Sequence, residues 1–173
     1  GLRTLTVIQD TINLVEKNRG IKVEYDKDMA DPKVYKLWQD GNTSGVFQFE
    51  SQGMTNFMKE LKPDCLEDLI AGVSLYRPGP MDQIPRYIKG KQNPGHNEYT
   101  HPSLEPILNV TYGCMVYQEQ VMQIVRELAG YSLGRADLVR RAMGKKKLDV
   151  MAKEREIFIN GQLDENGDVI VPG

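Results

Sequence analysis

The chain has 173 residues, of which 40% are hydrophobic and 27% charged, and its net charge is -2. This composition supports one domain or two small packed lobes and argues against disorder as the main state. The two cysteines form no metal-ligand pattern, no apolar run reaches the roughly 18 residues of a membrane helix, and the first residues lack the layout of a signal peptide. We therefore expect a reduced, cytoplasmic protein without a membrane partner.

The positive charge of the chain is concentrated in one segment. Residues 135–155 hold eight basic and three acidic residues, whereas the segments before and after them are both net acidic. Within this island, the stretch RRAMGKKK places five cations in eight positions. A single basic island on an acidic body indicates a local site for a polyanion rather than a general coat for nucleic acid.

The first predicted element is a helix over residues 5–20. Its apolar face consists of Leu5, Ile8, Ile12 and Val15. Gly20 lies just past the last apolar position, where a helix commonly stops.

A second helix is predicted to start at Pro32, with Asp31 as its N-cap. Its buried stripe is expected to comprise Val34, Leu37 and Trp38. The segment SGVFQFES that follows, residues 44–51, has alternating apolar positions and predicts a strand or an extended segment.

The centre of the chain predicts two helices, over residues 51–62 and 65–76, separated by Pro63. The next 27 residues, 76–102, hold five prolines and three glycines, so regular elements there should be short. A strongly amphipathic pattern then predicts a helix that ends at Gly130.

The basic island predicts an αα-hairpin. Its first helix covers residues 133–144, with Leu138, Val139 and Met143 expected inward and Gly144 as a left-handed cap. Its second helix covers residues 148–161, with expected core positions Val150, Met151, Ile157 and Phe158. The corner consists of Lys145, Lys146 and Lys147, and Arg140 and Arg141 precede it by about one turn.

Two interpretations of this hairpin compete. Lysines at a helix C-terminus can simply complement the helix dipole and stay solvated, for about 0.3–1 kcal/mol each. The adjacent arginine pair favours a phosphate ligand, because planar guanidinium groups match phosphate oxygens. A Walker loop is excluded, since Val139 stands where its first glycine is required.

Four long segments resemble one family in the same order and spacing: GVFQFES, LKPDCLEDLIAGVSLYRPGP, TYGCMVYQEQVMQIV and GYSLGRADLVRRAMGKKK. They resemble the bacterial DNA polymerase III alpha subunit, the C-family replicative DNA polymerase, over residues 1–161. The resemblance implies a mainly α fold, with a palm-edge helix over residues 1–20 and a helical fingers region over residues 21–161. Residues 162–173 are left as a hairpin or a flexible tail.

The resemblance also implies a division of chemistry. The arginine pair Arg140 and Arg141 would bind the triphosphate of the incoming deoxynucleotide, assisted by Lys145, Lys146 and Lys147, with Arg77 as a weaker candidate. The catalytic aspartates and their two magnesium ions would belong to a palm segment that precedes Gly1, so no catalytic residue or cofactor is expected in this chain and the chain alone should be inactive. Primer-template DNA, dNTP and other replisome subunits are the expected partners of the whole enzyme.

Other acidic and imidazole groups have simpler explanations. Asp26 and Asp28 are expected in a solvated turn, and His96 and His101 in loops. Asp164, Asn166 and Asp168 copy the start of a calcium loop, but Val169 replaces its required glycine. The pair Asn166-Gly167 more simply predicts a hairpin turn.

Two alternatives to nucleotide binding remain. The island could contact DNA backbone, although residues 135–155 lack the aromatic side chains of a single-strand platform. The chain could also be inert when it is separated from the rest of a polymerase. Cations that point to opposite sides, or that are locked in ion pairs with their own chain, would argue against the triphosphate hypothesis.

Overall fold

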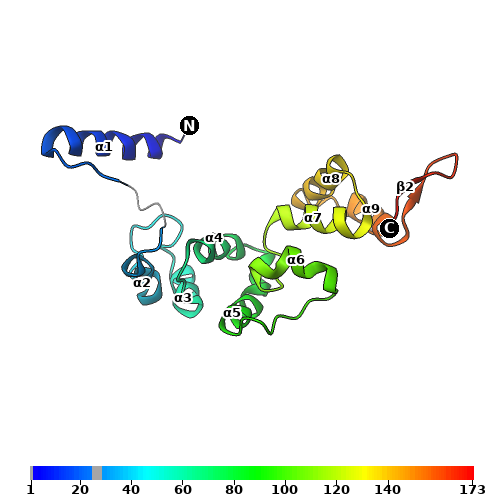
Figure 1. The fold of residues 1–173 in the computed structure, drawn as a ribbon, viewed down its shortest axis with the longest axis horizontal. Coiled ribbons are helices and arrows are strands. Elements are labelled where there is room, and N and C mark those ends of the chain that lie inside the picture. Colours follow the sequence, from blue (N-terminus) through cyan, green and yellow to red (C-terminus); the bar gives the residue numbers. More distant parts are fainter. Residues whose placement is uncertain (1, 25–28) are drawn as a thin grey trace.

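A computed structural model describes residues 2–24 and 29–173, and these residues are mainly helical, as the sequence predicts (Figure 1). The α-helices are α1 (Arg3–Arg19), α2 (Pro32–Asp40), α3 (Gln52–Leu61), α4 (Leu66–Leu75), α5 (Ile84–Gln92), α6 (Glu105–Leu108), α7 (Gln118–Ala129), α8 (Leu133–Gly144) and α9 (Leu148–Asn160). The 3-10 turns are η1 (Pro80–Gln83), η2 (Pro102–Leu104) and η3 (Asn109–Thr111), and the strands are β1 (Gln162–Leu163) and β2 (Val169–Val171).

Helix α1 confirms the first predicted element, and Gly20 ends it in a left-handed conformation with φ of 66°. The expected apolar face is present but not covered. No residue of α1 is buried, and Leu5 and Ile8 are exposed. Figure 1 shows α1 apart from the other helices.

Helix α2 begins as predicted, because the Asp31 carboxylate accepts a hydrogen bond from the backbone N–H of Lys33 at 2.8 Å. The predicted stripe was wrong in part. Tyr35 is the buried residue of α2, whereas Val34 and Leu37 are exposed. The helix turns its aromatic side chains inward, and these bury more apolar area than the aliphatic ones.

Residues 44–48 form successive turns and residues 49 and 50 have no regular structure, so the predicted strand is absent from this segment. Gln48 has a left-handed φ of 68°, which no regular strand accommodates. The buried Thr43 hydroxyl donates to the carbonyl of Phe49 at 2.7 Å, and Thr55 contacts the same carbonyl at 3.3 Å. Side chains therefore satisfy backbone groups here in place of a neighbouring strand.

Helices α2 to α5 surround the first of two hydrophobic cores. Helices α3 and α4 flank Pro63 as predicted. The buried members of this core are Tyr35, Phe49, Met54, Phe57, Met58, Leu61, Leu69, Ala71, Leu75, Tyr87, Ile88 and Cys114.

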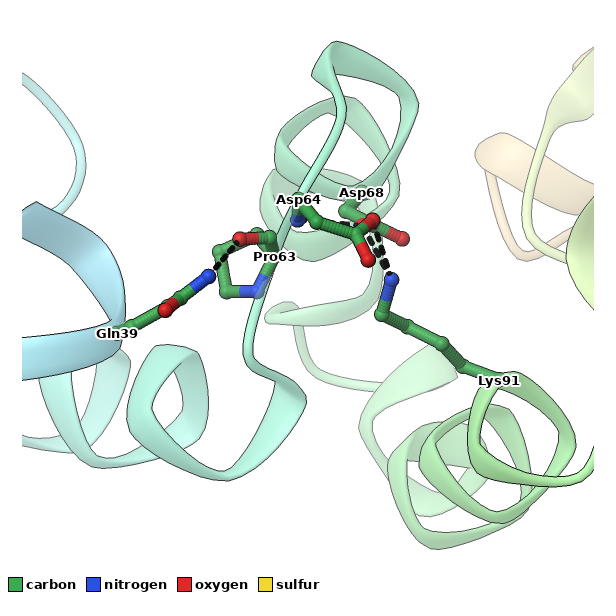
Figure 2. A network of polar contacts seen from close by, with 5 residues as sticks. All are labelled: Gln39, Pro63, Asp64, Asp68 and Lys91. Carbon is green, nitrogen blue, oxygen red and sulfur yellow. Dashed lines mark hydrogen bonds and ion pairs between the residues drawn. The ribbon is translucent and has the colours of Figure 1, made fainter. Parts of the chain in front are cut away.

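A buried ion pair joins α5 to the start of α4 (Figure 2). The Lys91 ammonium lies 2.7 Å from Asp68 and 2.8 Å from Asp64, and only 1% of the Asp68 side chain is exposed. Asp68 also accepts from the backbone N–H of Asp64 at 3.1 Å. Next to this network, the Gln39 amide donates to the Pro63 carbonyl at 2.8 Å and connects α2 to the same linker.

The second core lies between α7, α8, α9 and the C-terminal strand. Its buried members are Val125, Ala129, Tyr131, Ala136, Val139 and Val171. Met122, Met151, Ile157 and Phe158 are partly buried against it. Of the three inward positions predicted on α8, only Val139 is buried, while Leu138 and Met143 are exposed.

The αα-hairpin is present, but its cap differs from the prediction. Gly144 is the last residue of α8, and the left-handed residue is Lys146, with φ of 53°. The N–H of Lys147 reaches the Ala142 carbonyl at 3.0 Å, and that of Lys146 reaches Met143 at 3.1 Å. This is the Schellman pattern of helix closure, shifted two residues beyond the glycine.

The last residues form the hairpin that Asn166-Gly167 predicts. Strands β1 and β2 pair antiparallel, and Val171 is only 2% exposed in the second core. The Asp164 carboxylate accepts from the N–H groups of Asn166 and Asp168 at 2.8 and 2.9 Å. These two hydrogen bonds hold the pKa of Asp164 below its usual value.

Among the described residues, no helix has both the length and the apolar character needed to cross a membrane.

Replacing Lys91 with Met should strongly destabilise the first core, because the buried Asp68 carboxylate would lose its partner. Removal of one member of a buried ion pair costs about 3–5 kcal/mol. Urea unfolding monitored on the first core measures this loss, and Lys89→Ala, an exposed lysine on the same helix, is the control. A Lys91 variant as stable as the control would contradict a structural role for the pair.

The stability gained from Lys91 should also depend on pH. The hydrogen bond from Lys91 lowers the pKa of Asp64 in the folded chain from its ordinary value of 3.8. The ionised carboxylate therefore stabilises the fold above pH 3.8, and this contribution is lost as the pH falls through the lower folded value. The difference in unfolding free energy between the wild type and Lys91→Met should shrink from pH 6 to pH 3, whereas a constant difference would contradict the linkage.

Candidate functional site

Arg140 and Arg141 converge on one carboxylate of the same helix. Arg140 donates from Nε and Nη2 to Oδ1 of Asp137, at 2.8 and 2.7 Å. Arg141 Nε lies 3.0 Å from Oδ2 of the same residue. The spacings i+3 and i+4 place both arginines beside Asp137 on the surface of α8. The sequence analysis did not single out Asp137, although its spacing from the arginines was visible.

Arg140 also connects α8 to α7. Its Nη1 donates to Oε1 of Gln118 at 3.0 Å, and Gln118 is the first residue of α7. Two different helices therefore hold this one guanidinium group.

The electrostatics of the pair are those of a partly exposed surface cluster. The hydrogen bond from Arg140, with the charges of Arg140 and Arg141, keeps the pKa of Asp137 below its usual value. The side chain of Arg140 is 32% exposed and that of Arg141 is 60% exposed. Both arginines are thus in ion pairs with their own chain, the arrangement stated above to argue against triphosphate binding. Ion pairs at a partly exposed surface are weak, so a phosphate can compete for the same groups.

The lysine corner lies one turn farther on. Lys145, Lys146 and Lys147 are all exposed, and in the part of the chain that the structure describes they form no ion pair. No described contact joins their side chains to the arginine pair. The structure therefore brings the two arginines together and leaves the three lysines as a separate positive surface.

A cleft of about 980 Å³ runs between the elements of the two cores. Arg77 lines this cleft, as do Arg86, Gln118 and Met143. Arg140 reaches a residue of the cleft wall through its hydrogen bond to Gln118, whereas neither Arg140 nor Arg141 lines the cleft with Arg77. Arg86, which the sequence analysis did not identify, donates from Nη2 to the Glu98 carbonyl at 2.6 Å.

The start of α7, which supplies Gln118, is held by a buried amide. The Gln120 side chain is 3% exposed, and its Oε1 accepts from the N–H groups of Val116 and Tyr117 at 2.8 and 2.9 Å. Its Nε2 donates to the Thr111 hydroxyl at 2.8 Å and contacts the Ile107 carbonyl at 3.3 Å. The amide thus satisfies its own polar atoms and joins α7 to α6 and η3.

Arg135 fixes α8 against α9 and β1. Its guanidinium pairs with the two carboxylate oxygens of Glu154 at 3.0 and 3.3 Å and donates to Gln162 at 2.6 Å. It also lies 4.9 Å from the centroid of the Tyr131 ring. Tyr131 donates to the Glu154 carbonyl at 3.0 Å. Burial, together with a hydrogen bond and the negative charge of the Glu154 side chain, raises the pKa of Tyr131 to about 12. These contacts set the angle of the basic hairpin.

The described residues include one compact cluster of side chains of the kind that bind metals. One cluster, Asp64, Cys65 and Asp68, has metal-ligand atoms within 4.8 Å of one another. The ammonium of Lys91 already lies against both carboxylates, and burial raises the pKa of the Cys65 thiol to about 11. This cluster is therefore a structural ion pair.

The remaining candidates of the sequence analysis have ordinary roles or lie elsewhere. Asp26 and Asp28 are outside the described residues. Asp164 caps the β-hairpin turn with its carboxylate. His101 Nδ1 accepts from the N–H of Ser103 at 3.2 Å and caps η2, and His96 lines a separate cavity beside Arg86.

Comparison with known proteins identifies the family of this chain and several similar proteins. A profile described as the bacterial DNA polymerase III alpha subunit finger domain matches residues 4–166, and the chain belongs to this family. It is 52% identical over 167 residues to the DNA polymerase III subunit alpha of Thermus aquaticus, and 48% identical over 162 residues to that of Staphylococcus aureus strain COL. Each match covers 93% of this chain but only 14% and 15% of the two relatives, so the chain spans about a seventh of their length.

Replacing Arg135 with Ala should loosen the basic hairpin, because Glu154 would keep a carboxylate that is only 13% exposed without its partner. We expect a loss of about 3–5 kcal/mol in unfolding free energy, the cost of removing one partner of an ion pair that is largely buried. Hydrogen exchange of α9 and β1 amides measures the effect locally. Arg155→Ala is the control, since Arg155 is 71% exposed and pairs only with its neighbour Glu156. Equal exchange in both variants would contradict the role of Arg135.

Proposed function

We propose that this chain is the finger part of a bacterial replicative DNA polymerase and that Arg140 and Arg141 bind the triphosphate of the incoming deoxynucleotide. Lys145, Lys146 and Lys147 would add positive potential, and Arg77 would contact phosphate from the facing side of the cleft. Primer-template DNA, dNTP and further replisome subunits are the proposed partners of the whole enzyme, in the cytoplasm. The observation that supports the proposal is that the two guanidinium groups lie side by side at Asp137 and keep N–H groups beyond that ion pair, with the Arg141 side chain 60% exposed.

The chemical contribution of such groups is positioning and charge stabilisation. Nucleotidyl transfer places negative charge on the phosphate oxygens as the bond to the leaving group breaks. Guanidinium groups held in advance beside those oxygens lower the barrier without reorganising during the reaction. When bound, two divalent ions would supply activation of the primer hydroxyl. We propose that these ions bind elsewhere in the polymerase and that the chain alone is inactive; the compact cluster Asp64, Cys65 and Asp68 is already occupied by the Lys91 ammonium.

A contact with DNA backbone is the second candidate, and the lysine corner favours it. Three exposed ammonium groups without ion pairs among the described residues can each neutralise one phosphate. The logarithm of the affinity for duplex DNA would then fall linearly with the logarithm of the salt concentration, with a slope of about −0.9 for each phosphate contacted. Replacing the lysines would reduce this slope, whereas replacing the arginines would act mainly on the nucleotide.

Changing Arg140 or Arg141 to Ala in the full-length alpha subunit should reduce kcat/KM for dNTP by about 10- to 100-fold. This range follows from about 1.5–3 kcal/mol for a hydrogen bond to a charged group and 1.4 kcal/mol for each factor of ten. Steady-state incorporation on a fixed primer-template measures the loss.

Lys153→Ala, which removes one exposed cation from α9, serves as the matched control. Its kcat/KM should stay within about twofold of the wild type, as expected for an exposed cation without a defined partner. Arginine variants that behave like this control would remove the pair from the nucleotide site, and a change confined to DNA affinity would favour the backbone alternative.

A further inference from the structure

The arginine pair is held by two neighbours that the family resemblance does not assign to nucleotide binding. Asp137 uses both carboxylate oxygens, one for Arg140 and one for Arg141. Gln118 accepts from Arg140 across the α7–α8 junction. We propose that Asp137 and Gln118 are positioning residues that orient the two guanidinium groups toward a phosphate ligand, an inference that rests on the proposed function.

The count of hydrogen-bond donors shows how positioning leaves room for a ligand. A guanidinium has five N–H donors. In the described structure Arg140 uses three atoms, Nε and Nη2 toward Asp137 and Nη1 toward Gln118, so two of its N–H groups remain for another acceptor. Arg141 contacts Asp137 only through Nε, which leaves its four terminal N–H groups. A phosphate can therefore bind both arginines while Asp137 stays in place.

The geometry also explains how two like charges lie side by side. Adjacent arginines repel each other, and flexible side chains in this situation separate in solvent. The shared carboxylate neutralises one of the two charges and draws both groups to the same point. Gln118 adds a neutral contact from a second helix, which restricts Arg140 without changing the charge of the site.

Asp137 is expected to have two opposing effects on nucleotide binding and one favourable effect on rate. Its negative charge disfavours the nearby triphosphate in the ground state, while the order that it imposes favours binding, so the two effects offset each other in affinity. The rate depends on orientation at the moment of bond formation, where a misplacement of about 1 Å can cost about 100-fold. Loss of positioning should therefore appear mainly in the maximal rate.

The test compares Asp137→Asn, Gln118→Ala and Arg140→Ala in the full-length alpha subunit by single-turnover incorporation. Asp137→Asn and Gln118→Ala should lower the maximal rate by about tenfold, well within the cost of a misplaced group. The apparent Kd for dNTP should change less than about threefold, because order and repulsion offset each other. Asp149→Asn, which removes one exposed charge from the first turn of α9, is the charge-matched control and should leave the rate unchanged.

A structural readout accompanies the kinetics. In 15N NMR spectra of the 173-residue chain, the Nε–H signals of Arg140 and Arg141 should be resolved and protected in the wild type. Asp137→Asn should broaden both signals, and Gln118→Ala should broaden that of Arg140 alone. Thermal unfolding of each variant, within about 1 °C of the wild type because the substitutions lie on the surface, separates positioning from misfolding.

The outcomes distinguish the two proposals. Normal rates for Asp137→Asn and Gln118→Ala beside a defective Arg140→Ala would overturn the positioning role and leave the nucleotide site intact. A normal Arg140→Ala would overturn the nucleotide site itself. A tighter Kd together with an unchanged rate in Asp137→Asn would show that Asp137 is a competitor for the arginines, and would also overturn the inference. In the double variant Asp137→Asn with Arg140→Ala, the effects should be clearly less than additive.

Discussion

The position of the basic hairpin depends on the buried amide of Gln120. This side chain satisfies all its polar atoms within the joint between α6, η3 and α7. A buried amide in this state is directional, because any rotation leaves donors or acceptors unpaired at about 1–3 kcal/mol each. The first turn of α7 is fixed in this way, and with it Gln118, the contact of Arg140. The second core then packs on α7, so one polar joint sets the relation of the hairpin to the rest of the chain.

The two hydrophobic cores explain why a chain of this length presents a cleft rather than one closed surface. Each core is small, and the elements between them meet along a seam that polar side chains border. Each core is accompanied by a buried or half-buried ion pair that joins two helices. Lys91 pairs with Asp68 beside the first core, and Arg135 pairs with Glu154 beside the second. Such pairs are directional more than they are stabilising. They fix helix orientation, which small apolar cores do less well.

The sequence could predict the helices and the corner of the hairpin, because both follow from local periodicity and from the rules for helix ends. It could not predict that Tyr35 would be the buried residue of α2, or that Leu138 and Met143 of α8 would be exposed while Val139 is buried, since burial is decided by neighbours distant in sequence. The segment around Gln48 was predicted wrongly because alternating apolar residues also fit a series of turns when threonine side chains satisfy the backbone. In the candidate site, the cations are visible in the sequence. The partners that orient them are not, because the contact of Gln118 with Arg140 spans 22 positions.

The left-handed backbone of Lys146 lowers the stability of the fold at the lysine corner. A residue with a side chain in the left-handed region is less stable there than glycine, by about 1–2 kcal/mol, and this chain places a lysine at the position while Gly144 lies two residues earlier. A glycine at 146 would relieve the strain and remove a cation from the corner. Stability and positive potential therefore make opposite demands at residue 146. Selection of this chain for heat resistance would favour glycine there and so remove one cation from the lysine corner.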